Sequence, residues 1–447
     1  MKKRIDFTQG SLTTQLILFS FPLVMGELLQ NLYNSVDAFV VGNFVSDTAL
    51  GAISVCATLS TLLVGFFNGM SIGAIILISR AYGSRQTELL QRYIRVIFTF
   101  SAVLGAALSV AGVLGTEFLV RLSGPPDDVY AEAVTYLRIY LAGLVFTVVY
   151  NVSAGVLRAV GDSNAPFWIL VFTCCVNAAL DLLFVAGFDM GVAGVSFATV
   201  FSQFTSVVIV SWRISKQTNT SCFSFREIGS HGKEIILELL RVGMPSGLQN
   251  SLVSFSNLFV WRYVNQFGSA ATAGVGVAQR LDKFIAMPCK AFGTTLTTCI
   301  SQNIGAGNYE RVHSSIRKCT ALSVGVIAIL ELLALLFAPE CVSLFNDTPE
   351  VIAIGTAMVR TILPLYIIFA LREILYGILR GHGYTYVTTI LSLIGMIGIR
   401  QLFLAVSMAV HPSITNIYWC YPIAWGSTLL LIYIYYRIVK RRPEWEL

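Results

Sequence analysis

Polar side chains interrupt the first long apolar stretch of this 447-residue chain. Glu27, Gln30, Asn34 and Asp37 follow one another at intervals of three, four and three residues. That spacing places them on one face of a helix. A face with carboxylates and amides can hold a cation, a proton or a hydrogen-bonded ligand.

Two later segments repeat the pattern. Asn177 and Asp181 are one helical turn apart, and so are Thr199 and Gln203. Carboxylate, amide and hydroxyl oxygens are the ligands that Na⁺ and other hard cations prefer, while a carboxylate can instead exchange a proton. We therefore predict a cation or proton site formed by Asp37, Asn177, Asp181 and Thr199, with Na⁺ as the only metal ion it would bind. The choice between H⁺ and Na⁺ stays open.

The second half carries a different set of charges within apolar stretches, including Arg262, Glu373 and Arg400. Glu373 could pair with Arg262 or Arg400 in a charge-balanced structural network, or it could attract a cationic substrate. Tyr33 could contribute a cation–π contact to such a substrate. We count these residues, with Glu27, Gln30, Asn34 and Gln203, as substrate or coupling candidates.

The elements that position these groups are membrane helices. The chain is 55% hydrophobic and 12% charged, about half the charged fraction of a soluble protein, and its apolar runs are long enough to cross a bilayer of ~30 Å. The runs lack the alternation of barrel strands. We predict an all-α polytopic protein with twelve transmembrane helices, at 13–44, 51–80, 94–117, 131–158, 165–187, 191–213, 236–267, 272–304, 316–338, 350–380, 384–409 and 412–437.

The loops differ in charge. One alternate set, which includes both termini, contains nearly all the loop Lys and Arg residues, whereas the opposite set contains Arg121 and several acids. Basic loops face the cytoplasm. We predict that both termini are cytoplasmic.

The chain contains an internal repeat. Gly155-Val156-Leu157-Arg158 recurs 222 residues later as Gly377-Ile378-Leu379-Arg380, and Ser79 matches Ser301 at the same shift. An even number of helices per copy gives two parallel, pseudo-symmetric six-helix lobes. We predict an N-lobe at 1–214, a cytoplasmic linker at 215–235 and a C-lobe at 236–447.

The first helix of each copy contains a proline, Pro22 or Pro245. Proline removes a helical hydrogen bond, so these residues are predicted hinges, with static kinks as the alternative.

The acidic cluster is not repeated. At the 222-residue shift, Asn177 corresponds to Ile399 and Asp181 to Phe403. A residue needed only for lobe assembly would be expected in both copies. This difference favours a functional role for the first copy's acids over helix cross-linking alone.

Enzymatic motifs are missing from the sequence. It has no GxxxxGK[ST], HExxH or GxSxG pattern, and its four histidines are scattered. We predict a protein that is not an enzyme, has no cofactor and uses an ion gradient as its energy source.

The chain resembles the multidrug and toxic compound extrusion (MATE) transporters. The residues that carry the resemblance are Pro22 with Asp37 fifteen residues later, the run Asn177 to Asp181, Thr199, and the helix ends Ser79/Gly83 and Ser301/Gly305.

The resemblance implies a bacterial plasma-membrane antiporter that exports amphipathic organic cations in exchange for H⁺ or Na⁺, acts as a monomer and binds no nucleic acid. It implies an N-lobe cation site at Asp37, Asn177, Asp181 and Thr199. Val253 stands where some members have a C-lobe glutamate, so coupling would fall to the N-lobe and Glu373. The run from Gln30 to Asn34 is similar to the MepA-like bacterial branch.

Two other functions stay open. Intramembrane Arg262, Arg372 and Arg400 could bind phosphate, as in a flippase for a lipid-linked glycan or other anionic lipid. A sensor or scaffold without transport would not require a two-lobe repeat.

Overall fold

The fold is all-helical throughout the described part of the chain. This computed structural model describes residues 4–227, 229 and 232–441, without the side chains of 34–41, 43, 44, 47 and 58. Two compact units form within it: unit 1 holds the segment up to Ile5 and Met25–Gly247, and unit 2 holds Asp6–Val24 and the chain from Leu248 onward.

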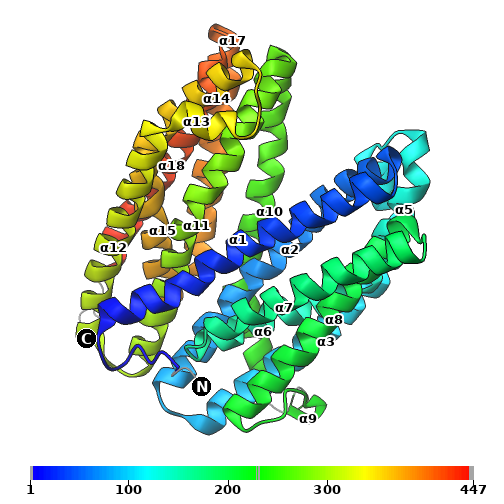
Figure 1. Cartoon of the computed structure of the whole chain (residues 1–447). Coiled ribbons are helices and arrows are strands. Elements are labelled where there is room, and N and C mark those ends of the chain that lie inside the picture. The colour runs from blue at the N-terminus through cyan, green and yellow to red at the C-terminus, as the bar shows by residue number, and fades with distance from the viewer. Residues whose placement is uncertain (1–3, 228, 230–231, 442–447) are drawn as a thin grey trace. The chain divides into compact units, whose positions relative to one another are not determined.

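Nine complete elements of unit 1 lie among the described residues. Its helices α2, α3, α6 and α8 pack lengthwise (Figure 1). The elements are α2 (Asp47–Gly83), α3 (Thr87–Leu114), α4 (Thr116–Ser123), α5 (Asp127–Ala142), α6 (Leu144–Ala159), α7 (Asn164–Asp181), the π-helix η1 (Leu182–Gly187), α8 (Gly191–Thr218) and α9 (Phe225–Glu227).

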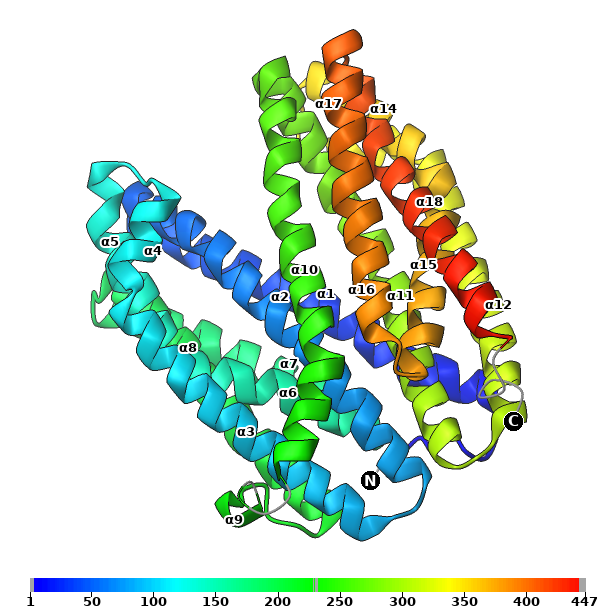
Figure 2. The same ribbon diagram turned by 180° about the vertical axis from the view of Figure 1, so that it is seen from behind.

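Unit 2 is built the same way. Its α11 packs against α14 and α15, and α15 packs against α18 (Figure 2). The elements are η3 (Asn265–Phe267), α11 (Ser269–Gly305), α12 (Tyr309–Leu336), α13 (Ala338–Ser343), α14 (Pro349–Ile362), η4 (Leu363–Leu365), α15 (Tyr366–Gly381), α16 (Thr385–Leu393), the π-helix η5 (Ile394–Ile399), α17 (Arg400–Val410) and α18 (Ile414–Val439).

Two helices belong to both units. α1 (Leu12–Phe44) starts in unit 2 and continues in unit 1 after Val24, and α10 (Lys233–Val264) starts in unit 1 and continues in unit 2 after Gly247. The predicted lobes at 1–214 and 236–447 are the two copies of the sequence repeat, which have other bounds than the packing units, and they stay a prediction. The first part of α1 therefore packs within unit 2, and the first part of α10 packs within unit 1.

The twelve predicted spans correspond to these helices. Nine described helices are long and apolar enough to cross a membrane, or ten if the pair Asp127–Ala142 and Leu144–Ala159, bent by 49°, is one span. The predicted spans 236–267 and 272–304 form as α10 and α11, which are more polar than the rest.

Two spans are interrupted where the sequence predicts continuous helices. The predicted span 131–158 bends at Gly143, where an added Cβ would lie 2.4 Å from the Val200 side chain. The span 350–380 is interrupted at η4, which contains Pro364. Glu331 accepts a hydrogen bond from the Ile367 N–H at 3.1 Å, so this buried carboxylate satisfies a donor beside the break.

The repeat is visible in the packing. The Ser79 hydroxyl donates to the Ala159 carbonyl at 3.3 Å, and the Ser301 hydroxyl donates to the Gly381 carbonyl at 3.2 Å. Each residue of the second pair follows its match by 222 residues. The two copies therefore share individual contacts as well as helix order.

The segment 218–227 lies against α3 in unit 1. Arg95 forms an ion pair with Glu227 at 2.6 Å, and the Phe98 and Phe223 rings meet edge to face. Cys222 is buried there, and burial raises the pKa of its thiol, which keeps it protonated and unreactive. This part of the predicted linker is thus a packed element of unit 1.

Candidate functional site

The strongest polar feature of unit 1 is the end of α7. Asn177 is 1% exposed and Asp181 is fully buried, one turn apart on the same helix face. α7 ends at Asp181, and η1 begins with the next residue. π-Helical turns inside longer helices occur frequently at functional sites, and an ionisable group inside a membrane span is a functional candidate.

α8 packs against α7 and supplies the next two candidates (Figure 1). Thr199 is buried, and its hydroxyl donates to the Val195 carbonyl at 3.0 Å, so its oxygen lone pairs can still accept. The Gln203 Oε1 atom is buried and has no hydrogen-bond partner within the described residues. Both side chains can offer oxygen to a cation or donor group.

The candidates on α1 are described only in part. Glu27 and Gln30 are exposed, and Tyr33 is half-buried. The side chains of Asn34 and Asp37 lie outside the described residues. Three members of the predicted cation site, all on α7 and α8, are therefore placed inside unit 1.

The charges of unit 2 are arranged differently from the expectation. Glu373 pairs with Arg372 at 2.7 Å, and the Arg372 guanidinium lies over the Phe369 ring at 4.2 Å. The predicted partners of Glu373, Arg262 and Arg400, were therefore wrong. Adjacent helix residues diverge on average, but these two long side chains reach each other.

Arg400 has no carboxylate partner within the described part of the chain. It is 1% exposed and donates to Asn257 Oδ1 at 2.9 Å and Ser256 Oγ at 2.7 Å. Arg262 is exposed in the last turn of α10. Within the described residues, the hydrogen-bond acceptors of the buried Arg400 guanidinium are neutral oxygens.

Sequence reasoning missed a second buried group in unit 2. The Tyr366 hydroxyl donates to Asp282 Oδ1 at 2.6 Å, and its ring packs against Trp425 and Phe369 with centroids 5.0 and 5.2 Å apart. The sequence could have indicated Asp282, because an acid inside a predicted span is a functional candidate. It gave no such indication for Tyr366, because tyrosine is common in membrane spans. The pair ties α11 to α15 beside the Glu373–Arg372 pair.

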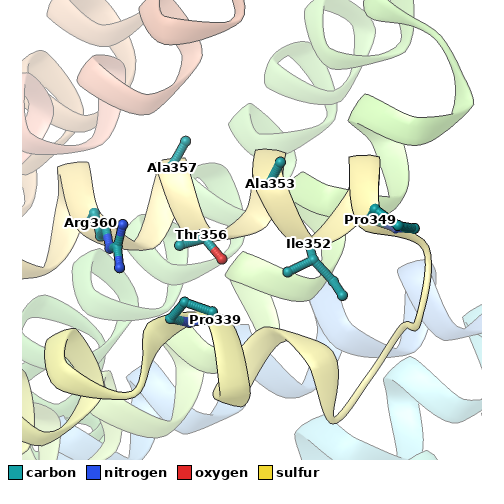
Figure 3. A pocket seen from close by; sticks show the side chains of 7 residues that line it. All are labelled: Pro339, Pro349, Ile352, Ala353, Thr356, Ala357 and Arg360. Atoms are coloured by element: carbon teal, nitrogen blue, oxygen red, sulfur yellow. The ribbon is translucent and has the colours of Figure 1, made fainter.

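No group of three or more His, Cys, Asp or Glu residues that could hold a metal ion occurs among the described residues. A cavity of about 490 Å³ lies between α13 and α14 in unit 2 (Figure 3). It contains none of the predicted site residues. The cavity is lined by Pro339, Pro349, Ile352, Ala353, Thr356, Ala357 and Arg360.

Comparison with known proteins identifies the lineage of this architecture. A family model described as MatE matches the chain twice, at residues 22–183 and 245–406. The two matches correspond to the two copies of the repeat, so each copy alone has the features of the family.

Full-length relatives are named for drug resistance. The chain is 29% identical to the probable multidrug resistance protein YoeA of Bacillus subtilis, covering 98% of this chain and 96% of that protein. It is 22% identical to the multidrug export protein MepA of Staphylococcus aureus, covering 96% and 95%. A solved structure described as the outward-facing conformation of a multidrug resistance MATE family transporter matches with a TM-score of 0.88 at 21% identity, over 98% of each chain.

Proposed function

Because this chain belongs to the MATE family of membrane transporters, we propose that it is a secondary active antiporter that exports amphipathic organic cations in exchange for H⁺ or Na⁺. In this proposal it acts as a monomer in the bacterial plasma membrane, with both termini in the cytoplasm and no cofactor. The names of its relatives support drug export.

The burial of Asp181 is the observation that carries the coupling proposal. A carboxylate taken out of water is costly unless it is hydrogen-bonded, protonated or bound to a cation. Asn177 one turn away and Thr199 on the packed neighbour helix offer oxygens for Na⁺, and Asp37 would complete the set. The second copy has Phe403 at the position matching Asp181, so the ion site is proposed for unit 1 alone.

Ion binding needs a way to alter the conformation, and the shared helices offer one. α1 changes from unit 2 to unit 1 after Val24, two residues beyond Pro22, and α10 changes from unit 1 to unit 2 after Gly247, two residues beyond Pro245. Proline removes a backbone hydrogen bond and weakens the helix at that point. We propose that these prolines are the hinges, and that occupancy of the ion site shifts the population between two conformations.

The cationic substrate is proposed to bind to carboxylates and aromatic rings. Glu27 is exposed on α1, and Tyr33 with Gln30 and Gln203 can add cation–π and hydrogen-bond contacts. Glu373 is already paired with Arg372 at 2.7 Å. It therefore offers a cation less free charge than Glu27.

Dye transport in inside-out membrane vesicles tests the proposal. A fluorescent organic cation is added, and a pH gradient and a Na⁺ gradient are imposed in separate runs. We expect one gradient to drive uptake by the wild type and neither to drive uptake by Asp181→Asn. The matched control is Asp128→Asn, an exposed acid in the first turn of α5, which should transport normally.

Wild-type transport by Asp181→Asn at equal expression would refute the coupling role of the buried carboxylate. Gradient-driven uptake of anionic but not cationic dyes would refute the proposed substrate class.

A further inference from the structure

An arginine is present at matching positions of the two copies, but only one of the two has a carboxylate partner. Arg138 on α5 pairs with Glu117 on α4 at 2.9 Å. Arg360 on α14 follows Arg138 by 222 residues, whereas the residue 222 positions after Glu117 is Pro339 on α13. The second copy thus kept the guanidinium, but Glu340, the acid next to Pro339 on α13, forms no ion pair with it within the described residues.

Arg360 faces the cavity beside Pro339, the residue that matches Glu117. Within the described residues it is exposed and makes no ion pair or hydrogen bond, and it lines the cavity between α13 and α14 together with Pro339 (Figure 3). The residue that replaces the acid and the arginine that lacks one therefore border the same space.

A second donor borders this cavity. Thr356 lies one turn before Arg360 on α14, is 8% exposed, and its Oγ1 atom has no hydrogen-bond partner within the described residues. The matching residue of the first copy is Val134, which has no hydroxyl. The second copy has therefore gained a hydroxyl where the first copy has none, and neither Thr356 Oγ1 nor Arg360 has a hydrogen-bond acceptor within the described residues.

The position of Arg360 in the membrane narrows the identity of that acceptor. α14 and α15 lie in one candidate span, Pro349–Gly381, and Arg360 is eleven residues from its start, about 16 Å along the helix axis. A guanidinium within a candidate span is costly unless an anion or water reaches it. The anion that a bilayer supplies in quantity is the phosphate of its lipid headgroups.

We propose that an anionic phospholipid binds in this cavity, with its phosphate between the Thr356 hydroxyl and the Arg360 guanidinium. Arginine binds phosphate through two parallel N–H donors, and such charge-assisted bonds are strong. The aliphatic lining formed by Ile352, Ala353 and Ala357 suits an acyl chain. The lipid phosphate would pair with Arg360 as the Glu117 carboxylate pairs with Arg138 in the first copy. Lipid binding at this site does not depend on the proposed antiport.

Native mass spectrometry of the detergent-purified full-length protein tests the site. Phosphatidylglycerol, diacylglycerol or inorganic phosphate is titrated in separate runs. We expect one retained phosphatidylglycerol per wild-type molecule and neither diacylglycerol nor phosphate at the same concentration. Arg360→Gln should weaken retention about tenfold and Thr356→Val about threefold, as expected for losing a charged and a neutral phosphate contact.

Two further variants use the repeat as an internal control. Pro339→Glu leaves both donors in place and returns a carboxylate to the position matching Glu117, so we expect it to displace the lipid as fully as Arg360→Gln does. An acid near a helix N-terminus is favourable, so this variant should fold. Arg138→Gln, the matched change in the first copy, should retain the lipid as the wild type does.

Equal retention by the wild type, Arg360→Gln and Pro339→Glu would overturn the proposal. If diacylglycerol, which has no phosphate, is retained as tightly as phosphatidylglycerol, the proposed phosphate contact is overturned. Inorganic phosphate bound as tightly as the lipid would show an anion site without lipid recognition and would also overturn it.

Discussion

The two copies of the repeat agree where backbone and small side chains meet, and differ where charges lie. Ser79 and Ser301 make the same hydrogen bond to the matched carbonyls of Ala159 and Gly381. These contacts fix helix spacing and are independent of what the protein transports. Their presence in both copies indicates that duplication preserved the scaffold.

A second matched contact, formed by Asp162 in the first copy and Tyr384 in the second, uses different chemistry in each copy. Asp162 accepts a hydrogen bond from Arg213 at 3.0 Å in unit 1. The residues 222 positions later are Tyr384 and Tyr435, whose rings lie 6.1 Å apart in unit 2. An ion pair joins the loop before α7 to α8, and an aromatic pair joins the loop before α16 to α18, so this position requires contact but no particular charge.

The arginine of the repeated motif shows the same contrast. Arg158 interacts electrostatically with Glu27 of α1, whereas Arg380 donates to Gln249 of α10 at 3.1 Å. The partner in the second copy is thus a neutral amide on α10, whereas α1 of the first copy carries an exposed acid at Glu27. The first copy has a buried acid at Asp181 where the second has Phe403, and the proposed ion site rests on this difference.

The largest expected effect concerns the shared scaffold. A Cβ at Gly155 would lie 2.9 Å from the Ser71 carbonyl oxygen, and one at Gly377 would lie 2.6 Å from that of Gly293. Because helix backbones would have to separate, Gly155→Ala and Gly377→Ala should each destabilise the protein by about 2–3 kcal/mol. Thermal unfolding in detergent measures this loss. If only one variant is destabilised, the scaffolds are not equivalent.

Loss of the Asp162 contacts should give the next largest loss of stability. Asp162 also accepts from the Ala165 N–H at 2.9 Å and from the Gln217 side-chain amide, so Asp162→Ala removes the acceptor of three donors and should cost about 2 kcal/mol. Tyr384→Ala removes the matching ring pair and should cost about 1 kcal/mol. The same unfolding assay compares them, and equal or reversed losses would contradict the ranking.

A swap at the first helix should alter transport more than stability. Glu27→Gln replaces this acid by a neutral amide like the one that contacts Arg380 in the second copy, and we expect dye efflux to fall about tenfold, the equivalent of about 1.4 kcal/mol, with an unchanged unfolding temperature. The control is Gln249→Glu, which adds an acid to the second copy. An efflux rate unaffected by Glu27→Gln would show that the unequal charge at this position has no functional consequence.

The smallest effect is expected at the shared hydrogen bonds. Ser79→Ala and Ser301→Ala should each lower the free energy of unfolding by about 0.5–1 kcal/mol, because each leaves one carbonyl with one hydrogen bond fewer. Chemical denaturation resolves such differences when the two variants are measured together. A loss confined to one variant would mean that the matched bonds differ in strength.

Most of the fold could be predicted from the sequence because membrane helices are encoded by long apolar runs. The span 13–44 corresponds to α1 at Leu12–Phe44, and the spans 236–267 and 272–304 correspond to α10 and α11. The bend at Gly143 was not predictable, since it depends on close packing with Val200. The exchange of helix segments between units depends on tertiary contacts that no local pattern contains.

The candidate site was predictable to a similar extent. The spacing of Asn177 and Asp181 indicated a shared helix face, and both side chains are buried. The pairing of Glu373 with Arg372 was missed because adjacent helix residues normally diverge. Arg360 could have been found by applying the 222-residue shift to Arg138, although the cavity beside it could not.

The central claim is that the first copy alone holds the coupling ion, and ion release measures it most directly. The purified protein is loaded with H⁺ or ²²Na⁺, an organic cation substrate is added, and the ion released per protein molecule is counted for the wild type, Asp181→Asn and Glu373→Gln. We expect release from the wild type and from Glu373→Gln, and none from Asp181→Asn. Release that persists in Asp181→Asn but is lost in Glu373→Gln would contradict the account, because the coupling carboxylate would then lie in the second copy.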